Sequence, residues 1–225
     1  MFSFDVDSGE VHLYGDIGPE WAGMIGAESV KMALDEMGGK DFTMYLSSPG
    51  GSVDIGTDVY NAIDRYKGKV TIIVDAIAAS MGSYILQAAD TRIVATNSKV
   101  MVHNPWGLAI GDAAALRKEA DVIDKYRDAM IPGYTSATGK TEEEIRSLMD
   151  AETWYVGKEI VDAGFADKVL GTSKKAVAIE DVQRWARNAI PEQFAQDFPL
   201  RSKARDSIRS MSVADARARL KAVMH

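Results

Sequence analysis

Cysteine is absent from the 225-residue sequence, and histidine occurs only three times. Without cysteine the chain can form no disulfide, no thiolate metal site and no cysteine nucleophile, and a reducing compartment is compatible with it. The histidines His12, His103 and His225 are too few for a multi-histidine metal centre. We therefore expect no metal and no cofactor.

Long hydrophobic runs are also lacking. No stretch of about 18 apolar residues occurs, so the sequence predicts no membrane-spanning helix. Residues 1–16 carry acidic side chains where a secretory signal would need a basic start followed by an apolar run. Hydrophobic residues make up 46% of the chain and charged residues 26%, which is enough for one substantial core. We expect a soluble protein of the cytoplasm with no membrane partner.

The net charge of −7 is distributed unevenly along the chain. Residues 171–225 contain 11 Lys and Arg against 6 Asp and Glu, whereas residues 1–170 contain 15 against 27. In the basic segment, helical spacing occurs at 179–189 and 213–223, and the basic residues are mixed with acids rather than interleaved with aromatics. We expect an ordinary solvated or subunit-contacting helix face there and no nucleic-acid partner.

Short apolar runs alternate with helical stretches through the first half of the chain. The two patterns predict strands at 10–16, 42–47, 70–75, 91–95 and 99–103, and helices at 20–37 and 55–66. The alternation predicts an α/β fold in which mostly parallel strands are covered by helices.

The pattern changes after residue 103. Residues 112–130 have apolar side chains three or four positions apart, and the pattern ends at Pro132, which predicts one long helix that projects or serves as an oligomer arm. Thr141, followed by three glutamates, predicts a capped helix at 141–149, since acids favour the positive end of the helix dipole. A short helix is predicted at 158–163.

The first chemical feature is a serine within a run of small residues. Ser80 lies in the segment AASMGS at 78–83, between a buried strand pattern and an apolar helix pattern. At such a strand-to-helix turn a serine Oγ can sit at the positive end of a helix, which stabilises developing negative charge. The same small residues are equally expected where a helix packs closely on a sheet. Ser83, three residues later, is the competing serine.

The second feature is His103, at the end of an apolar strand pattern and just before a turn. A general base for a serine needs a histidine held at the end of an element, where it can reach the hydroxyl. A lone histidine is more often a satisfied core residue. His12 lies within a strand pattern and His225 is the last residue, so if a base exists it is His103.

The third feature is the pair of glycines Gly50 and Gly51 in the segment SSPGGSV at 47–53. Adjacent glycines expose backbone N–H groups and let another chain approach, which suits an oxyanion hole or a docking edge for an extended peptide. A phosphate-binding loop would need the lysine and hydroxyl of GxxxxGK[ST], which are missing. On its own, Pro-Gly-Gly is a common turn.

Four motifs resemble the Clp protease proteolytic subunit in order and spacing: SPGGSV at 48–53, AASMGS at 78–83, MVHNPW at 101–106, and the stretch from ETW to GFAD at 152–167. The variants YGD at 14–16, HNPW, and MDAETW at 149–154 are most similar to the Clp-related head maturation proteases of tailed bacteriophages. The resemblance covers about residues 9–170. We therefore expect a serine peptidase domain at 1–170 and a basic helical extension at 171–225.

This resemblance implies a crotonase-like ββα superhelix with a projecting handle helix. Such subunits assemble into rings and cut peptide bonds with a triad of serine, histidine and acid. Carried over to this sequence, Ser80 is the nucleophile and His103 is the base. The backbone amides of Gly51 and Met81 would form the oxyanion hole.

The acid of the triad has two candidates. Aligning Trp154 and Glu159 with the family's aromatic residue and its later glutamate puts Glu152 where the housekeeping protease has Asp. Asp150 lies two residues earlier and has the expected residue type. Either carboxylate could orient the imidazole and stabilise its protonated form.

For substrate and partners, the resemblance implies a protein chain extended along the Gly50 and Gly51 edge inside a homo-oligomeric ring. In a phage the substrates would be scaffold and capsid precursor segments, in the prohead or the host cytoplasm. The helix at 112–130 would be the handle that joins one ring to another. Two alternatives stay open: a catalytically silent, ring-forming scaffold protein, and an acyl-CoA-handling crotonase relative that holds a thioester oxyanion.

Overall fold

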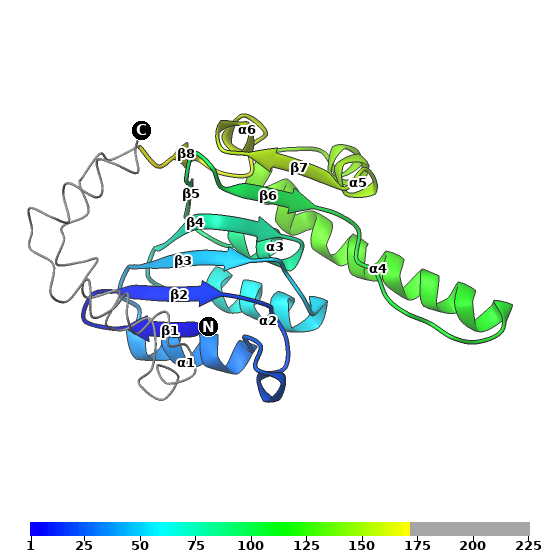
Figure 1. The fold of residues 1–225 in the computed structure, drawn as a ribbon, viewed down its shortest axis with the longest axis horizontal. Helices are drawn as coiled ribbons and strands as arrows, with labels where there is room; N and C mark the ends of the chain where they lie inside the picture. Colours follow the sequence, from blue (N-terminus) through cyan, green and yellow to red (C-terminus); the bar gives the residue numbers. More distant parts are fainter. Residues whose placement is uncertain (172–225) are drawn as a thin grey trace, which may run out of the picture. The chain divides into compact units, whose positions relative to one another are not determined.

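The structure, a computed structural model, describes residues 1–171, which are built on one mixed β-sheet with helices packed behind it (Figure 1). The strands are β1 (Phe2–Asp5), β2 (Glu10–Tyr14), β3 (Phe42–Ser48), β4 (Val70–Ala79), β5 (Thr91–Val94), β6 (Lys99–Val102), β7 (Thr153–Val156) and β8 (Lys168–Val169). The helices are η1 (Glu20–Ala22), α1 (Ala27–Met37), α2 (Val53–Asp64), α3 (Met81–Leu86), α4 (Ala113–Thr138), α5 (Glu142–Asp150) and α6 (Lys158–Asp162). The extension predicted at 171–225, with its two helices, lies outside the described residues except for Gly171.

The sheet follows the order β1-β2-β3-β4-β5-β8, and β2, β3, β4, β5 and β8 run parallel. On the edge opposite β3, strand β4 pairs with two strands in turn: residues 71–74 pair with β5 and residues 77–79 pair with β6. β7 pairs antiparallel with β6, and β1 pairs antiparallel with β2. The predicted α/β fold with mostly parallel strands is confirmed.

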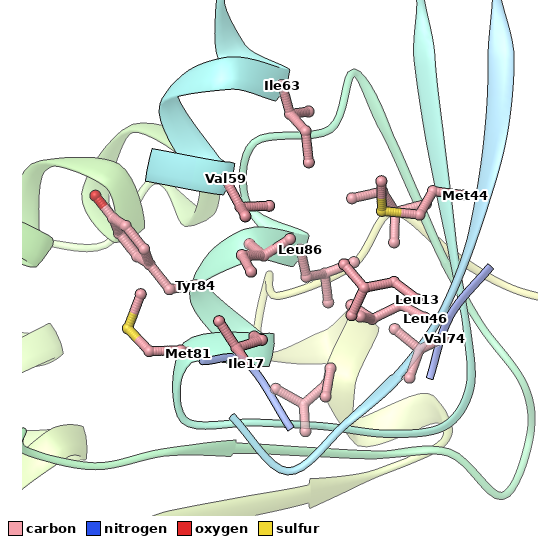
Figure 2. Close-up of a cluster of buried hydrophobic side chains, with 14 of the residues drawn as sticks. Leu13, Ile17, Met44, Leu46, Val59, Ile63, Val74, Met81, Tyr84 and Leu86 are labelled. Atoms are coloured by element: carbon pink, nitrogen blue, oxygen red, sulfur yellow. The ribbon is translucent and has the colours of Figure 1, made fainter. Parts of the chain in front are cut away.

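Alternating side chains put one face of this sheet in the core. Along β2, β3 and the first half of β4, every second residue is buried and its neighbours are partly exposed. Figure 2 shows Leu13, Leu46 and Val74 of the sheet near Val59 of α2 and Leu86 of α3. Burial of each such side chain contributes about 1.5–3 kcal/mol. This packing fixes the end of β4, where Ser80 follows.

The predicted projecting helix is α4, which extends away from the sheet (Figure 1). It begins after Asp112, whose side chain accepts a hydrogen bond of 2.9 Å from the N–H of Ala115. Residues 113–129 are largely exposed, and the helix becomes buried only from Met130 onward. The exposed part contacts the rest of residues 1–171 at only a few points, among them the hydrogen bonds from Tyr126 to Asp54 and from Arg146 to Asp128.

The expected end of this helix before Pro132 is wrong. The helix continues through Pro132 to Thr138 and ends at Gly139, which adopts the left-handed conformation with φ 71°. An interior proline costs about 3 kcal/mol, because it removes a backbone hydrogen bond and crowds the preceding turn. Ile131 and Tyr134 on either side are fully buried. Their packing offsets the cost and carries the helix past the proline.

The single helix predicted at 20–37 is also wrong, because the structure divides this segment into η1 and α1. Gly23 adopts a left-handed conformation with φ 76° and ends η1. The residues that follow are tied to an extended neighbour: Ile25 N–H donates to the carbonyl of Asp16, and Gly18 N–H donates to the carbonyl of Ile25. The apolar spacing misleads because Ile25 is buried without being helical.

The other elements predicted before residue 171 are present with shifted ends. The largest shift is in β4, which runs on to Ala79 because β6 gives it a second pairing partner. Helix α5 has the predicted cap, in which Thr141 and Glu144 bond reciprocally to each other's backbone. The pattern does not predict β1, β7 or β8, which are two to four residues long. Within residues 1–171 no helix is long and apolar enough to cross a bilayer.

Candidate active site

Ser80 occupies a strained turn between β4 and α3. Its backbone has φ 53° and ψ −124°, and among the described residues it shares a positive φ with only one other non-glycine residue, Glu152. Such a conformation costs about 1–3 kcal/mol and persists only where its surroundings enforce it. The Ser80 N–H donates to the carbonyl of Met101 at 3.0 Å, and the Ser80 carbonyl accepts from the N–H groups of Ser83 and Tyr84. These bonds fix the direction of the Ser80 side chain.

His103 lies within hydrogen-bond distance of this serine. Its Nε2 atom is 2.9 Å from the Oγ atom of Ser80. The histidine follows directly after β6, which is held between β4 on one side and β7 on the other. A base at this distance can take the proton of the hydroxyl as the oxygen attacks an electrophile.

The two glycines of the 47–53 segment pack against the serine turn. A Cβ added to Gly50, whose φ is 103°, would lie 2.6 Å from the Ser80 Cβ and 2.9 Å from the Met81 nitrogen. Gly51 contacts Ile17 so closely that a Cβ there would overlap the Ile17 carbonyl oxygen. Both positions therefore require glycine. The N–H groups of Gly51 and Met81 donate no hydrogen bond to any acceptor within residues 1–171.

The two candidate acids lie at the turn between α5 and β7. Asp150 Oδ1 accepts a hydrogen bond of 2.7 Å from Asn104 Nδ2, and Glu152 Oε1 accepts one of 3.3 Å from the indole N–H of Trp154. Neither carboxylate forms a hydrogen bond with His103 in the described structure. The geometry thus brings Ser80 and His103 together but joins neither acid to them.

The competing serine has a packing role. Ser83 is fully buried, and its Oγ donates to the Ser80 carbonyl at 2.7 Å and shares a hydrogen bond of 2.8 Å with the Tyr134 hydroxyl. Burial raises the pKa of Tyr134, so its hydroxyl stays neutral and available for this bond. The first turn of α3 is therefore anchored by neutral hydrogen bonds. Burial also raises the pKa of Tyr84, which belongs to the same helix, to about 12.

Of the other two histidines, the structure describes only His12, which takes no part in this cluster. His12 lies in the middle of β2 with its ring stacked on Tyr45, the centroids 5.0 Å apart. His225 is outside the described residues. Within residues 1–171 no group of three His, Asp or Glu is placed to hold a metal ion.

Sequence reasoning did not single out Asn104 or Tyr134. Asn104 follows His103 directly, but an asparagine before a proline is an ordinary turn residue and gives no sign of a partner 46 positions away. Tyr134 lies beyond the proline at which the long helix was expected to end. In both cases the contact depends on tertiary packing.

The sheet in which β4 pairs with both β5 and β6, the projecting helix α4 and the contact between Ser80 and His103 together define a class. This class is the serine-type peptidases with a crotonase-like α/β fold. The chain belongs to the Clp protease family, whose sequence profile matches residues 6–173. The resemblance to Clp protease proteolytic subunits is thus confirmed at the level of the family.

Two relatives and one solved structure illustrate this similarity. The chain is 34% identical over 138 residues to the ATP-dependent Clp protease proteolytic subunit 1 of Protochlamydia amoebophila, which covers 60% of this chain and 67% of the relative. It is 28% identical over 161 residues to the subunit 1 protein of Leifsonia xyli subsp. xyli, covering 71% and 81%. A mutant ClpP1 from Listeria monocytogenes superimposes with a TM-score of 0.66 at 26% identity, covering 75% of this chain and 94% of that chain.

Proposed function

We propose that this chain is a serine endopeptidase in which Ser80 is the nucleophile and His103 the general base. The observation that carries this proposal is the 2.9 Å contact between Ser80 Oγ and His103 Nε2. The strained backbone of Ser80 adds support, because strain of this kind is concentrated at functional sites.

The reaction follows from the atoms around Ser80. Ser80 Oγ attacks the scissile carbonyl carbon while His103 Nε2 takes the hydroxyl proton. The oxyanion that forms accepts hydrogen bonds from the N–H groups of Gly51 and Met81, which have no other acceptor within residues 1–171. His103 then gives its proton to the leaving amine, and a water molecule repeats the two steps on the acyl-enzyme.

A carboxylate of the turn between α5 and β7, Glu152 or Asp150, completes the triad by orienting the imidazole and stabilising its protonated form. The substrate lies extended along the Gly50 and Gly51 edge, where main-chain hydrogen bonds are indifferent to sequence. Specificity then comes from side-chain pockets or from confinement in a ring. The exposed part of α4 supports a homo-oligomeric ring, because it presents apolar side chains such as Leu116, 45% exposed, to solvent and contacts the rest of residues 1–171 at few points.

The substrates we propose are scaffold and capsid precursors of a tailed bacteriophage, cleaved during head maturation in the prohead or the host cytoplasm. This assignment is supported by the residues at 14–16, 103–106 and 149–154, where the sequence is most similar to Clp-related head maturation proteases. It is tested by incubating the purified protein with such precursors and, in parallel, with casein. Preferential cleavage of the precursors supports it. Cleavage of casein alone, or only with an ATP-driven unfoldase present, contradicts it.

The test of the peptidase itself is fluorophosphonate labelling of the folded protein, read by intact mass and peptide mapping. We expect a single adduct on Ser80, which disappears in Ser80→Ala and persists in Ser83→Ala. An adduct on another residue contradicts the assignment of Ser80. No adduct on an assembled sample favours the catalytically silent scaffold, a reading supported by the missing contact between His103 and either acid.

A further inference from the structure

Asp150 and Glu152 lie two residues apart, but the structure gives them different partners. Asp150 is the last residue of α5, and its Oδ1 atom lies 2.7 Å from Nδ2 of Asn104. Asn104 is the neighbour of His103 in the chain, at the start of the irregular segment that leads to α4. The Asp150 carboxylate therefore binds the side chain of the residue next to the histidine rather than the imidazole ring.

The oxygen end of the Asn104 amide supports the same role for Asp150. Its Oδ1 atom is buried and has no hydrogen-bond partner within residues 1–171. A buried acceptor without a partner is unfavourable, so the amide must be held in place by what its donor end gains. That gain is a hydrogen bond to an ionised carboxylate, which is about twice as strong as a neutral one. The contact between Asn104 and Asp150 is thus the anchor of this side chain.

Strand pairing puts Glu152, not Asp150, opposite the histidine. In the antiparallel ladder between β6 and β7, Val102 pairs with Thr153, so His103 and Glu152 are the next residues in register beyond its end. Glu152 also has a positive φ, of 47°, which among the described non-glycine residues it shares only with Ser80. Its present contact, to the Trp154 indole, is exposed and long at 3.3 Å, so the carboxylate can leave it readily.

We infer that Asp150 is a positioning residue that acts on His103 through Asn104, and that the triad carboxylate is Glu152. This inference rests on the proposed peptidase function and assigns the acid within it. Asp150 keeps the turn after β6 in place, so that Nε2 stays at Ser80 Oγ. Glu152 supplies the negative charge that the imidazole needs when it carries the proton.

A matched pair of isosteric variants separates the two roles, since Asp150→Asn and Glu152→Gln each remove a charge and keep the shape. An asparagine at position 150 still offers an oxygen to Asn104 but forms the weaker neutral bond, so we expect peptide hydrolysis and fluorophosphonate labelling to fall about threefold. Glu152→Gln removes the orienting charge, and we expect hydrolysis to fall by a factor on the order of 10³ to 10⁴.

The coupling through Asn104 is tested by truncation. We expect Asp150→Ala and Asn104→Ala each to slow labelling of Ser80 about 10-fold or more, because the base is displaced from the hydroxyl. The double variant should be no slower than either single variant, since both remove the same contact. Recovery in Asp150→Asn of most of what Asp150→Ala loses would show that Asp150 acts through its hydrogen bond to Asn104 and not through a charge on the imidazole. Circular dichroism and sedimentation establish that each variant is folded and assembled.

Two results overturn the inference while leaving the peptidase intact. One is an Asp150→Asn variant as inactive as Ser80→Ala, and the other is a Glu152→Gln variant with wild-type hydrolysis. A different result overturns the proposed function and this inference with it, namely a wild-type protein that is not labelled at Ser80 or a Ser80→Ala variant that still cleaves. The Ser80→Ala control therefore distinguishes the two kinds of failure.

Discussion

Gly50 lies directly against Ser80, and a methyl group at residue 50 would come within 2.6 Å of the Ser80 Cβ atom and 2.8 Å of the Ala79 carbonyl oxygen. The contacts are with backbone and Cβ atoms, which cannot swing aside as the end of a flexible side chain can. We therefore expect Gly50→Ala to displace the serine turn and to reduce fluorophosphonate labelling of Ser80 at least 10-fold, roughly the effect of misplacing a reacting group by about 1 Å.

The matched control for this change is Gly139→Ala at the end of α4. Gly139 also has a positive φ, of 71°, but a Cβ there would meet no atom within 4 Å. This variant should lose about 1 kcal/mol in free energy of unfolding from backbone strain and keep its labelling rate. Equal labelling in both variants would mean that the contact between residues 50 and 80 does not position the nucleophile.

Replacing Ser83 tests which serine reacts. Ser83→Ala removes two hydrogen bonds, a partly buried one to the Ser80 carbonyl and a buried one with the Tyr134 hydroxyl, and leaves the tyrosine without this partner. We expect the free energy of unfolding, measured with urea, to fall by about 1–3 kcal/mol while Ser80 is still labelled. Tyr134→Phe removes the other half of the same bond. In the double variant the free energy of unfolding should therefore fall by less than the sum of the two single changes. A folded Ser83→Ala protein without any label would identify Ser83 as the nucleophile.

Lowering the pH should weaken the contact between Arg92 of β5 and Asp167, the residue just before β8. Burial raises the pKa of Asp167, but hydrogen bonds from the side chain and backbone N–H of Arg92 outweigh this effect and hold the pKa below its ordinary value. Because the folded-state pKa is lowered, the stabilisation is present above the unfolded-state pKa of about 4 and is lost as the pH falls through the folded-state value.

Because the Asp167 side chain is 40% exposed and partly screened by solvent, we expect Asp167→Asn to lower the free energy of unfolding by about 1 kcal/mol at neutral pH and to differ less from the wild type near pH 3. Urea denaturation at both pH values measures this. The control is Asp162→Asn, which breaks the exposed ion pair with Lys158 and should change stability by no more than about 0.5 kcal/mol. A difference for Asp167→Asn that is the same at both pH values would contradict the role of the ionised carboxylate.

The sequence was sufficient for the elements whose signals are local. The alternation in β3 and the capping pair of Thr141 and Glu144 each reside within a few residues, and the structure has both. The break at Gly23 and the continuation through Pro132 are different, because each depends on contacts with distant segments. Apolar spacing alone favours a continuous helix through Gly23, and propensity alone favours a helix end at Pro132.

For the candidate site, the sequence predicted that Ser80 and His103 act together but did not choose between the two acids. Ser80 and His103 stand out because each follows a strand and has chemistry suited to acyl transfer. The acid could not be chosen in this way, because Asp150 and Glu152 have the same chemistry and nearly the same position. What distinguishes them is the contact of Asp150 with Asn104 and the register of β6 against β7, which only the folded chain supplies.

The charged surface of α4 makes assembly sensitive to salt. Four basic and four acidic side chains, mostly exposed, are interleaved along its projecting part: Arg117, Lys118, Glu119, Asp121, Asp124, Lys125, Arg127 and Asp128. A balanced pattern of this kind can pair with the same helix of a second copy, and exposed pairs are screened as the Debye length falls from about 10 Å at 0.1 M to about 3 Å at 1 M salt. We expect the sedimentation coefficient to decrease over this range.

Neutralising part of the pattern should reproduce the effect of salt. In a double variant with Asp121→Asn and Lys125→Gln, we expect a smaller sedimentation coefficient at low salt and a weaker dependence on ionic strength than in the wild type. Lys40→Gln, a change of one exposed charge away from α4, serves as the control and should leave both unchanged. Sedimentation that is constant from 0.1 to about 1 M salt in the wild type would show that apolar contacts such as Leu116, 45% exposed, hold the copies together instead.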